Sequence, residues 1–339
     1  MEWIRYIGVL SVLLVGALGC TRSSTTPSSS AGSSPADRSV PMIVDTDANN
    51  ELDDQHAIAY ALLNEGAFDV RGITVNRTAS GGPIENHLEE ARRVVKLCGR
   101  SSDVPVRRGA SGTFRAIAPE LETDQYDGHD AVDFIIEQAH AVDDGPLVLL
   151  PIGKLTNIAL ALKKDPSIAD DVRILWLGSN FPDAGEYNLR NDTSAVNPVI
   201  DSEALFEIAV VRYNRSSGTA AVQAFLPEIR ERMSGAGPRV DTPVTGRHGG
   251  EFTTFGDYSV SLFEHVGQNA RALYDVAAAA LVKNPDWAER RTVGSYRLVD
   301  GQWVSRQSGD ELVIWELFHT SKIVEDFYRT VERAGSDGG

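Results

Sequence analysis

The sequence predicts an α/β fold: a doubly wound, mostly parallel open sheet with helices on both faces. Almost continuously apolar runs of strand length, such as 146–153 and 172–178, alternate with longer stretches whose apolar residues recur every three or four positions. Unbroken apolar strands are typical of a sheet covered on both faces, and their alternation with helices is typical of parallel strands. No linker-like segment interrupts the alternation, so we expect one large α/β domain rather than two.

The elements follow one another from Val40, and the spacing of the apolar residues changes at each boundary. We expect strands at 40–47, 68–75, 104–109, 146–153, 172–180 and 206–214. We expect helices at 53–63, 84–99, 131–141 and 155–165, from Asp192 onward, and at 220–233.

The pattern changes after about Glu289. Asp300 and Gly301 lie at the centre of 296–304, which predicts a β-hairpin because this dipeptide suits the turns that join antiparallel strands. Residues 311–317 are typical of a further strand and 322–335 of a closing helix. The predicted domain therefore runs over 40–339 and ends in a hairpin and a helix.

The N-terminal segment has the features of an export signal. Arg5 precedes an apolar run, 7–18, that is short for a bilayer span and is followed by Gly19 and Cys20. The sequence ALGC with the Ser/Thr/Pro-rich tract after it resembles a bacterial lipobox, in which the cysteine is lipidated. We expect 1–20 to be an export signal of lipoprotein type and 21–39 a tether, so that the exported chain meets the membrane through a lipid anchor. A signal without lipidation stays the alternative.

Composition narrows the class of partner. The chain has 32 basic and 48 acidic residues and a net charge of −16, which argues against a nucleic-acid polymer as ligand. A small molecule fits better as the ligand.

The only cysteine besides Cys20 is Cys98, so the domain has no internal disulfide, and Cys98 is expected to be a buried helix residue. A homo-oligomer stays open.

Acidic residues crowd the turn after the first predicted strand. Ligands of a parallel sheet bind beyond the carboxyl ends of its strands, and this end carries four aspartates and Glu51, with one further aspartate in the apolar stretch 272–281. Like charges repel unless a cation lies among them. Since no Cys or His is among these ligands, Ca²⁺ suits the site better than zinc. The aspartates are Asp45, Asp47, Asp53, Asp54 and Asp275.

Four motifs in this order resemble the inosine/uridine-preferring nucleoside hydrolases. They are VDTDANNELDDQHAIAYAL, PIGKLTNIALAL, GSNFPDAGEYNLRNDTSA and LYDVAAAAL, and the resemblance covers roughly 40–289. It implies an N-ribosyl hydrolase that releases free base and ribose from nucleosides or related ribosides. It also implies that Ca²⁺ is bound by Asp47, Asp54, Asp275 and the backbone carbonyl of Ile152.

The same resemblance implies roles for the remaining candidates. Asp47 would act as the general base, Asp45 would brace the turn, and the substrate would contact Asp53, Asn180, Glu186, Asn188 and Tyr274. These residue types suit the chemistry, because cleavage of a glycosidic bond passes through an oxocarbenium-like sugar that needs an activated water and nearby carboxylates. Helix capping is the structural alternative for the Asn and Glu residues.

Two features depart from the family pattern. The loop Ala48–Leu52 is longer than usual between the aspartates, and Tyr274 stands where the family often has a histidine that protonates the leaving base. A phenol with a pKa near 10 is a poor acid at neutral pH, although Tyr274 could relay a proton from His248 in a Gly-rich loop. The base that is cleaved is therefore not determined by the sequence.

Two other functions compete with hydrolysis. A non-catalytic, lipid-anchored nucleoside-binding protein would use the same contacts, but capture alone does not require Asp47 and Asp54 together. A phosphatase of the haloacid-dehalogenase type shares the Asp-x-Asp after the first strand, yet the downstream phosphate-holding motifs of that class are missing.

Overall fold

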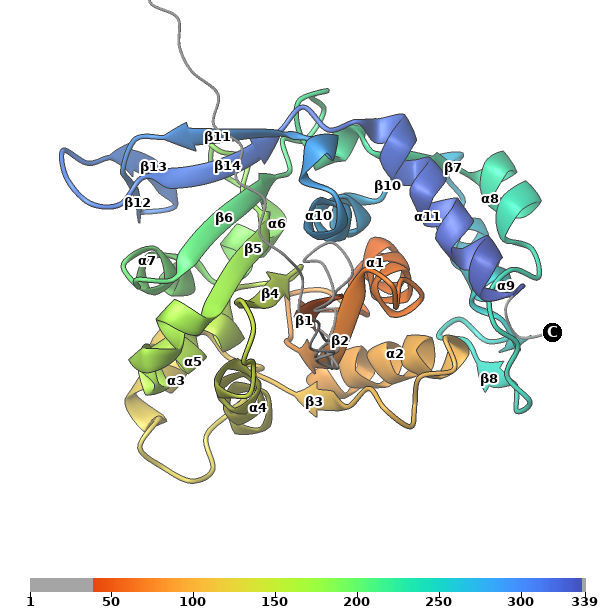
Figure 1. Cartoon of the computed structure of the whole chain (residues 1–339), viewed down its shortest axis with the longest axis horizontal. Coiled ribbons are helices and arrows are strands. Elements are labelled where there is room, and N and C mark those ends of the chain that lie inside the picture. The colour runs from red at the N-terminus through yellow and green to blue at the C-terminus, as the bar shows by residue number, and fades with distance from the viewer. Residues whose placement is uncertain (1–38, 337–339) are drawn as a thin grey trace, which may run out of the picture. The chain divides into compact units, whose positions relative to one another are not determined.

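The first strand of the chain lies inside the main sheet, with neighbouring strands on both sides (Figure 1). In the computed structural model, which describes residues 39–336, β1 (Val40–Thr46) pairs in parallel with β2 on one side and β4 on the other. Within these residues the main sheet has eight strands in the order β11-β14-β6-β5-β4-β1-β2-β3. Their bounds are Phe68–Val75 for β2, Val106–Arg108 for β3, Leu147–Pro151 for β4, Val172–Gly178 for β5, Leu205–Val210 for β6, Glu289–Val293 for β11 and Leu312–Glu316 for β14.

The pairing confirms a mostly parallel sheet, because β11 is the one strand in it that runs antiparallel to its neighbour in the described residues. The predicted hairpin is β12 (Tyr296–Val299) and β13 (Gln302–Ser305), with positive φ at Asp300 and Gly301. The strand predicted at 311–317 is β14, and it joins the main sheet beside β6. Two small antiparallel pairs are β7 (Gln223–Phe225) with β10 (Ala270–Ala272), and β8 (Val244–Thr245) with β9 (Glu251–Phe252).

Helices cover both faces of the sheet (Figure 1). One apolar core joins the sheet to α1 (Asp53–Leu62), α2 (Ile84–Leu97), α8 (Leu226–Met233), α9 (Phe255–Val266), α10 (Tyr274–Lys283) and α11 (Thr320–Ala334). The second core joins it to α3 (Phe114–Ile117), α4 (His129–His140), α5 (Thr156–Lys164) and α7 (Thr193–Ile200). Successive side chains of β1 point to opposite faces of the sheet, as in any pleated strand. Met42 and Val44 therefore belong to the first core and Ile43 to the second.

The helix predicted at 220–233 is wrong in its first part. Thr219–Ala221 is a 3-10 turn, and Gln223–Phe225 is β7, so that α8 begins only at Leu226. The antiparallel partner β10 lies far along the chain, so local spacing could not reveal it. Pro227 fits the first turn of α8, where its missing N–H costs nothing.

The sheet has its topological switch beside β1. The chain passes from β1 through α1 to β2 on one side, and it reaches β4 on the other side only after β3 and α4. Connections that diverge from neighbouring strands leave a crevice at their carboxyl ends. The predicted site residues after β1 and β4 therefore face the same opening.

Four further helical segments are short. The helix α6 (Tyr187–Asn191) follows β5, and 3-10 turns lie at Ala118–Glu120, Pro166–Asp171 and Pro285–Trp287. Between residues 39 and 336, no helix is both long enough and apolar enough to cross a membrane.

Packing of α11 against α1 gives a first prediction. The Phe327 ring is fully buried and lies 5.5 Å, centroid to centroid, from the imidazole of His56 on α1. We expect Phe327→Ala to lower the free energy of unfolding by about 3–5 kcal/mol, because it removes buried apolar area and leaves a cavity. Urea unfolding measures the change. The matched control is Phe225→Ala, whose ring is 47% exposed and whose loss should change stability by about 0.5 kcal/mol or less. Equal effects of the two variants would contradict the assignment of Phe327 to the core.

Candidate active site

The turn after β1 places the acidic residues at the topological switch point of the sheet. Its backbone is fixed by the amide of Asn50 and by Nδ1 of His87, which donate to the carbonyl oxygen of Asp47 at 2.9 Å and 2.8 Å. Asp53 and Asp54 then form the first turn of α1, where the free backbone N–H groups of a helix favour negative charge. All three aspartates are buried.

Asp45 lies near the end of β1 and joins this strand to neighbouring elements. Its carboxylate accepts hydrogen bonds from the hydroxyl of Thr74 (2.7 Å) and from the side-chain amides of Asn76 (2.9 Å) and Asn157 (2.6 Å). These donors come from β2, the residue after it, and α5. Burial raises the pKa of Asp45 to about 6, against the lowering by its hydrogen bonds.

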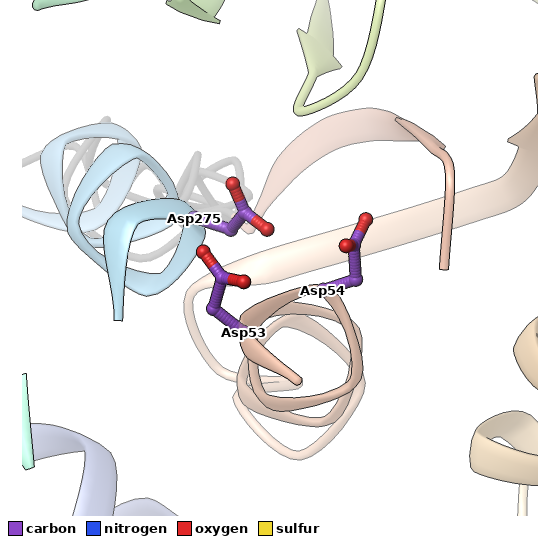
Figure 2. A group of neighbouring side chains, drawn as sticks. All are labelled: Asp53, Asp54 and Asp275. Atoms are coloured by element: carbon purple, nitrogen blue, oxygen red, sulfur yellow. The ribbon is translucent and has the colours of Figure 1, made fainter. Parts of the chain in front are cut away.

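Three carboxyl groups converge from two helices, as Figure 2 shows. Asp53 and Asp54 at the start of α1 and Asp275 at the start of α10 each place an oxygen within 4.8 Å of the others. The Thr46 hydroxyl holds Asp54 by a hydrogen bond of 2.6 Å. Asp47 lies outside this closest group, and its carboxylate accepts a hydrogen bond from the Thr78 hydroxyl.

A cavity of about 240 Å³ contains these groups. Of the ten positions predicted for the site, counting Asp47 once, it brings together Asp47, Asp53, Asp54, Ile152, Glu186, Asn188, Tyr274 and Asp275. The other lining residues are Asn50, Glu51, Ser80, Leu177, Tyr187, Val211, Tyr213 and Arg271.

The two predicted residues that do not line the cavity are Asp45, near the end of β1, and Asn180. The side-chain oxygen of Asn180 accepts a hydrogen bond from the backbone amide of Tyr213 at 3.3 Å. In this geometry Asn180 holds the segment after β6 beside the cavity.

Glu186 and Asn188 combine a structural role with a place on the cavity wall. The Glu186 carboxylate caps α6 and accepts from the backbone amides of Ser179 (3.0 Å), Asn188 (2.9 Å) and Leu189 (2.8 Å). The amide group of Asn188 donates to the carbonyl oxygens of Ile152 (2.9 Å) and Leu177 (3.1 Å). Helix capping, the structural alternative for Glu186, is thus present, and both side chains are held rigidly.

Burial dominates the electrostatics of the carboxyl groups. It raises the pKa of Asp47 and of Asp53 to about 7, and repulsion by neighbouring carboxylates, Asp53 on Asp47 and Glu51 on Asp53, adds to that effect. The pKa values of Asp54 and Asp275 are raised well above the usual range by the same two causes. Without a cation, the cluster therefore binds protons that free aspartates would release at neutral pH.

The donor set fits a hard metal ion. The acidic groups offer only oxygen atoms, and Ile152, whose carbonyl oxygen accepts a hydrogen bond from Asn188, lines the same cavity. Gly153 is part of this arrangement, because a Cβ there would lie 2.9 Å from Oδ1 of Asp47 and from Nδ2 of Asn76. A larger residue would force both side chains to move.

Several lining residues were missed by the sequence reasoning. Tyr213 follows β6, so the rule that ligands lie beyond strand ends could have found it. Arg271 and Ser80 carried no such signal. His248, considered as a proton source, does not line the cavity; its ring stacks on His265 at 3.4 Å between centroids.

Comparisons with known proteins agree with this architecture. The family model described as inosine-uridine preferring nucleoside hydrolase matches residues 42–329. The probable uridine nucleosidase 2 of Oryza sativa is 32% identical over 217 residues, which are 56% of this chain and 61% of that protein. A pyrimidine-specific ribonucleoside hydrolase of Shewanella woodyi is 31% identical over 183 residues, which are 47% of this chain and 56% of that protein. The matched part thus spans less than two thirds of either relative.

A solved structure shows the same fold. A plant nucleoside hydrolase superimposes with a TM-score of 0.67 at 19% identity, over 87% of this chain and 99% of the other. At that identity the likeness concerns the fold, while the family model covers nearly all of the described residues. The chain belongs to the inosine-uridine preferring nucleoside hydrolase family.

Proposed function

We propose that this chain hydrolyses the N-glycosidic bond of ribonucleosides and releases free base and ribose. The observation that carries the proposal is the single cavity at the switch point of the sheet, which joins the acidic cluster to Glu186 and Asn188. The names of the two relatives, which specify uridine and pyrimidine ribonucleosides, support nucleosides as the substrate class. The volume of about 240 Å³ suits a small molecule.

Calcium is the proposed cofactor, held by Asp47, Asp54, Asp275 and the carbonyl oxygen of Ile152. Oxygen-only ligands and several carboxylates favour Ca²⁺ over zinc or copper. When bound, the ion would neutralise the acidic cluster and acidify a water molecule. Its positive charge would also return the aspartates to their ionised form.

Asp47 is the proposed general base. Its carboxylate lies in the cavity, and the Thr78 hydroxyl fixes its orientation. An ionised carboxylate in this position can accept the proton that the attacking water loses. The neighbouring Asp53 faces the same volume and can accept a hydrogen bond from a ribose hydroxyl.

The sugar is proposed to lie between Asp53 and the wall formed by Glu186 and Asn188. Because the amide group of Asn188 already donates to two backbone carbonyls, its side-chain oxygen is left as an acceptor for a sugar hydroxyl. The Glu186 carboxylate adds negative charge beside the ring, which favours an oxocarbenium-like transition state. Asn180 would act through Tyr213, whose hydroxyl lies 3.4 Å from the Glu186 carboxylate.

Export and lipidation remain proposals, because Cys20 and the segment 21–38 lie outside the described residues. The support for them is the sequence ALGC and the tract that follows it. Lipidation at Cys20 would place the hydrolase at a membrane surface.

The general base can be tested by Asp47→Asn, which keeps the shape of the side chain and removes its basicity. We expect kcat on uridine to fall by a factor of about 10² to 10⁴ or more, because proton transfer and metal binding both suffer. Ribose release measures turnover, and circular dichroism checks the fold.

The matched control is Asp300→Asn in the exposed hairpin turn, where Asn tolerates the positive φ and activity should not change. Asp47→Asn that keeps more than a tenth of the wild-type rate would remove Asp47 from this role. Uridine binding by the wild type without any ribose release would favour the non-catalytic nucleoside-binding alternative.

The metal proposal predicts a pH-dependent gain in stability. The pKa values of Asp47 and Asp53 in the folded state, about 7, exceed the ordinary value of 3.8, so these groups stabilise the metal-free fold below pH 3.8 and lose that effect as the pH rises through 7. Calcium competes with the bound protons, so the rise in Tm that it causes should grow from about pH 5 to about pH 8. At about 100 times its Kd the ion should add about 2.7 kcal/mol.

Melting curves with excess Ca²⁺ and with excess chelator measure this gain. Asp54→Asn should reduce the calcium-dependent rise, whereas Asp300→Asn should leave it unchanged. Superimposable curves at every pH would show that the cluster does not bind calcium.

The lipidation proposal is tested with Cys20→Ser in a bacterial host. The wild type should incorporate labelled fatty acid and sediment with membranes, and the variant should lose the label. Cys98→Ser is the matched control, because Cys98 is buried and cannot be acylated in the folded protein. Label retained by Cys20→Ser would overturn the lipobox interpretation.

A further inference from the structure

The longer loop after β1 reaches across the cavity to β10. The carboxylate of Glu51, which belongs to the extra residues of that loop, forms an ion pair with Nη2 of Arg271. Arg271 lies on β10, three positions before Tyr274, the residue that replaces the family histidine. Both partners line the cavity. The two departures from the family pattern therefore meet on the same wall.

A guanidinium carries five N–H donors, and the contacts of Arg271 with other side chains use two of them. Nη2 pairs with Glu51, and Nη1 donates to the side-chain oxygen of Gln268 at 3.2 Å. Nε is buried and has no hydrogen-bond partner among the described residues. Nη1 and Nη2 each carry a second N–H group, which can donate to an oxygen atom of a molecule in the cavity that Arg271 lines.

Arg271 is also the one cationic side chain among the described residues that line the cavity. The wall otherwise consists of six acidic groups, three tyrosines and neutral residues, and it includes no histidine or lysine. A pyrimidine base that leaves without a proton carries negative charge on its ring nitrogen and on the adjacent carbonyl oxygen. Within the described wall, a guanidinium is the group best suited to stabilise that charge.

We propose that Arg271 binds the leaving base, donating from its guanidinium to the carbonyl oxygen beside the glycosidic nitrogen, and that Glu51 orients the guanidinium for this contact. The proposal rests on the proposed hydrolase function and names its substrate class as nucleosides whose base carries such a carbonyl. Arg271 takes the place of an acid catalyst without transferring a proton, since a guanidinium stays charged at all relevant pH values.

The step balances with one water molecule. The C1′–N bond breaks and its electron pair stays with the base, which leaves as an anion hydrogen-bonded to Arg271. Water forms the new C1′–O bond and gives a proton to the Asp47 carboxylate. The base then takes up a proton from solvent, and Asp47 returns its proton to solvent. Ribose and neutral base are the products.

The test compares two leaving groups in the full chain supplied with Ca²⁺. Uridine needs help to lose its base, whereas p-nitrophenyl riboside releases a phenolate that is already stable at neutral pH. For Arg271→Met we expect kcat/KM to fall by about 10² to 10³ on uridine and by less than about fivefold on p-nitrophenyl riboside. Glu51→Gln should show the same preference with a smaller loss.

Arg247→Met is the matched control. The Arg247 guanidinium donates to the backbone carbonyl of Glu51 at 3.4 Å but does not line the cavity, so its loss should leave the ratio of the two kcat/KM values unchanged. Equal losses on both substrates in Arg271→Met, or no loss on uridine, would overturn the proposal while the hydrolase function stands. A wild-type chain that cleaves neither substrate would overturn both.

Discussion

Carboxyl groups from the turn after β1 and from the start of α10 share one buried volume, and their mutual repulsion is the constraint on which the site depends. Hydrogen bonds from Thr46 and Thr78 hold two of them in place but add no positive charge. Arg271, the one cationic side chain among the described residues that line the cavity, is already paired with Glu51. A bound metal ion would resolve the repulsion and leave ionised carboxylates available for chemistry.

The rest of the fold keeps this unfavourable arrangement from relaxing. Asp45 joins β1 to β2 and α5 through three hydrogen bonds, and the aromatic rings around His56 fix α1 behind the cluster. On the opposite wall, the C-terminal hairpin supports the loop that carries Glu186. The indole N–H of Trp303 donates to the hydroxyl of Ser179 at 2.8 Å, and the Ser179 amide in turn donates to the Glu186 carboxylate. Elements from both ends of the described chain therefore position one cavity.

The proposed reaction is divided between two groups of residues that line the cavity. The carboxylates, among them Asp47 and Asp53, would bind the ion, the water and the sugar. Arg271 and the tyrosines would receive the base. The family histidine is replaced by Tyr274, so charge stabilisation by a guanidinium is the available substitute for proton donation. In this proposal the longer loop supplies Glu51, the carboxylate that would orient Arg271.

The sequence by itself determined the alternating elements and the parallel sheet, because apolar spacing is local. Its strand ends and family motifs also pointed to half of the residues that line the cavity. The turn at Asp300 and Gly301 was equally local. Only the tertiary structure decided that β14 lies beside β6, that 223–225 pairs as β7 with β10, and that Arg271 meets Glu51. Each of these depends on contacts between residues far apart in the chain, which leave no periodic pattern in the sequence. Burial raises the pKa of Asp47 and Asp53, and it too depends on how distant elements pack around these residues, so only the tertiary structure shows it.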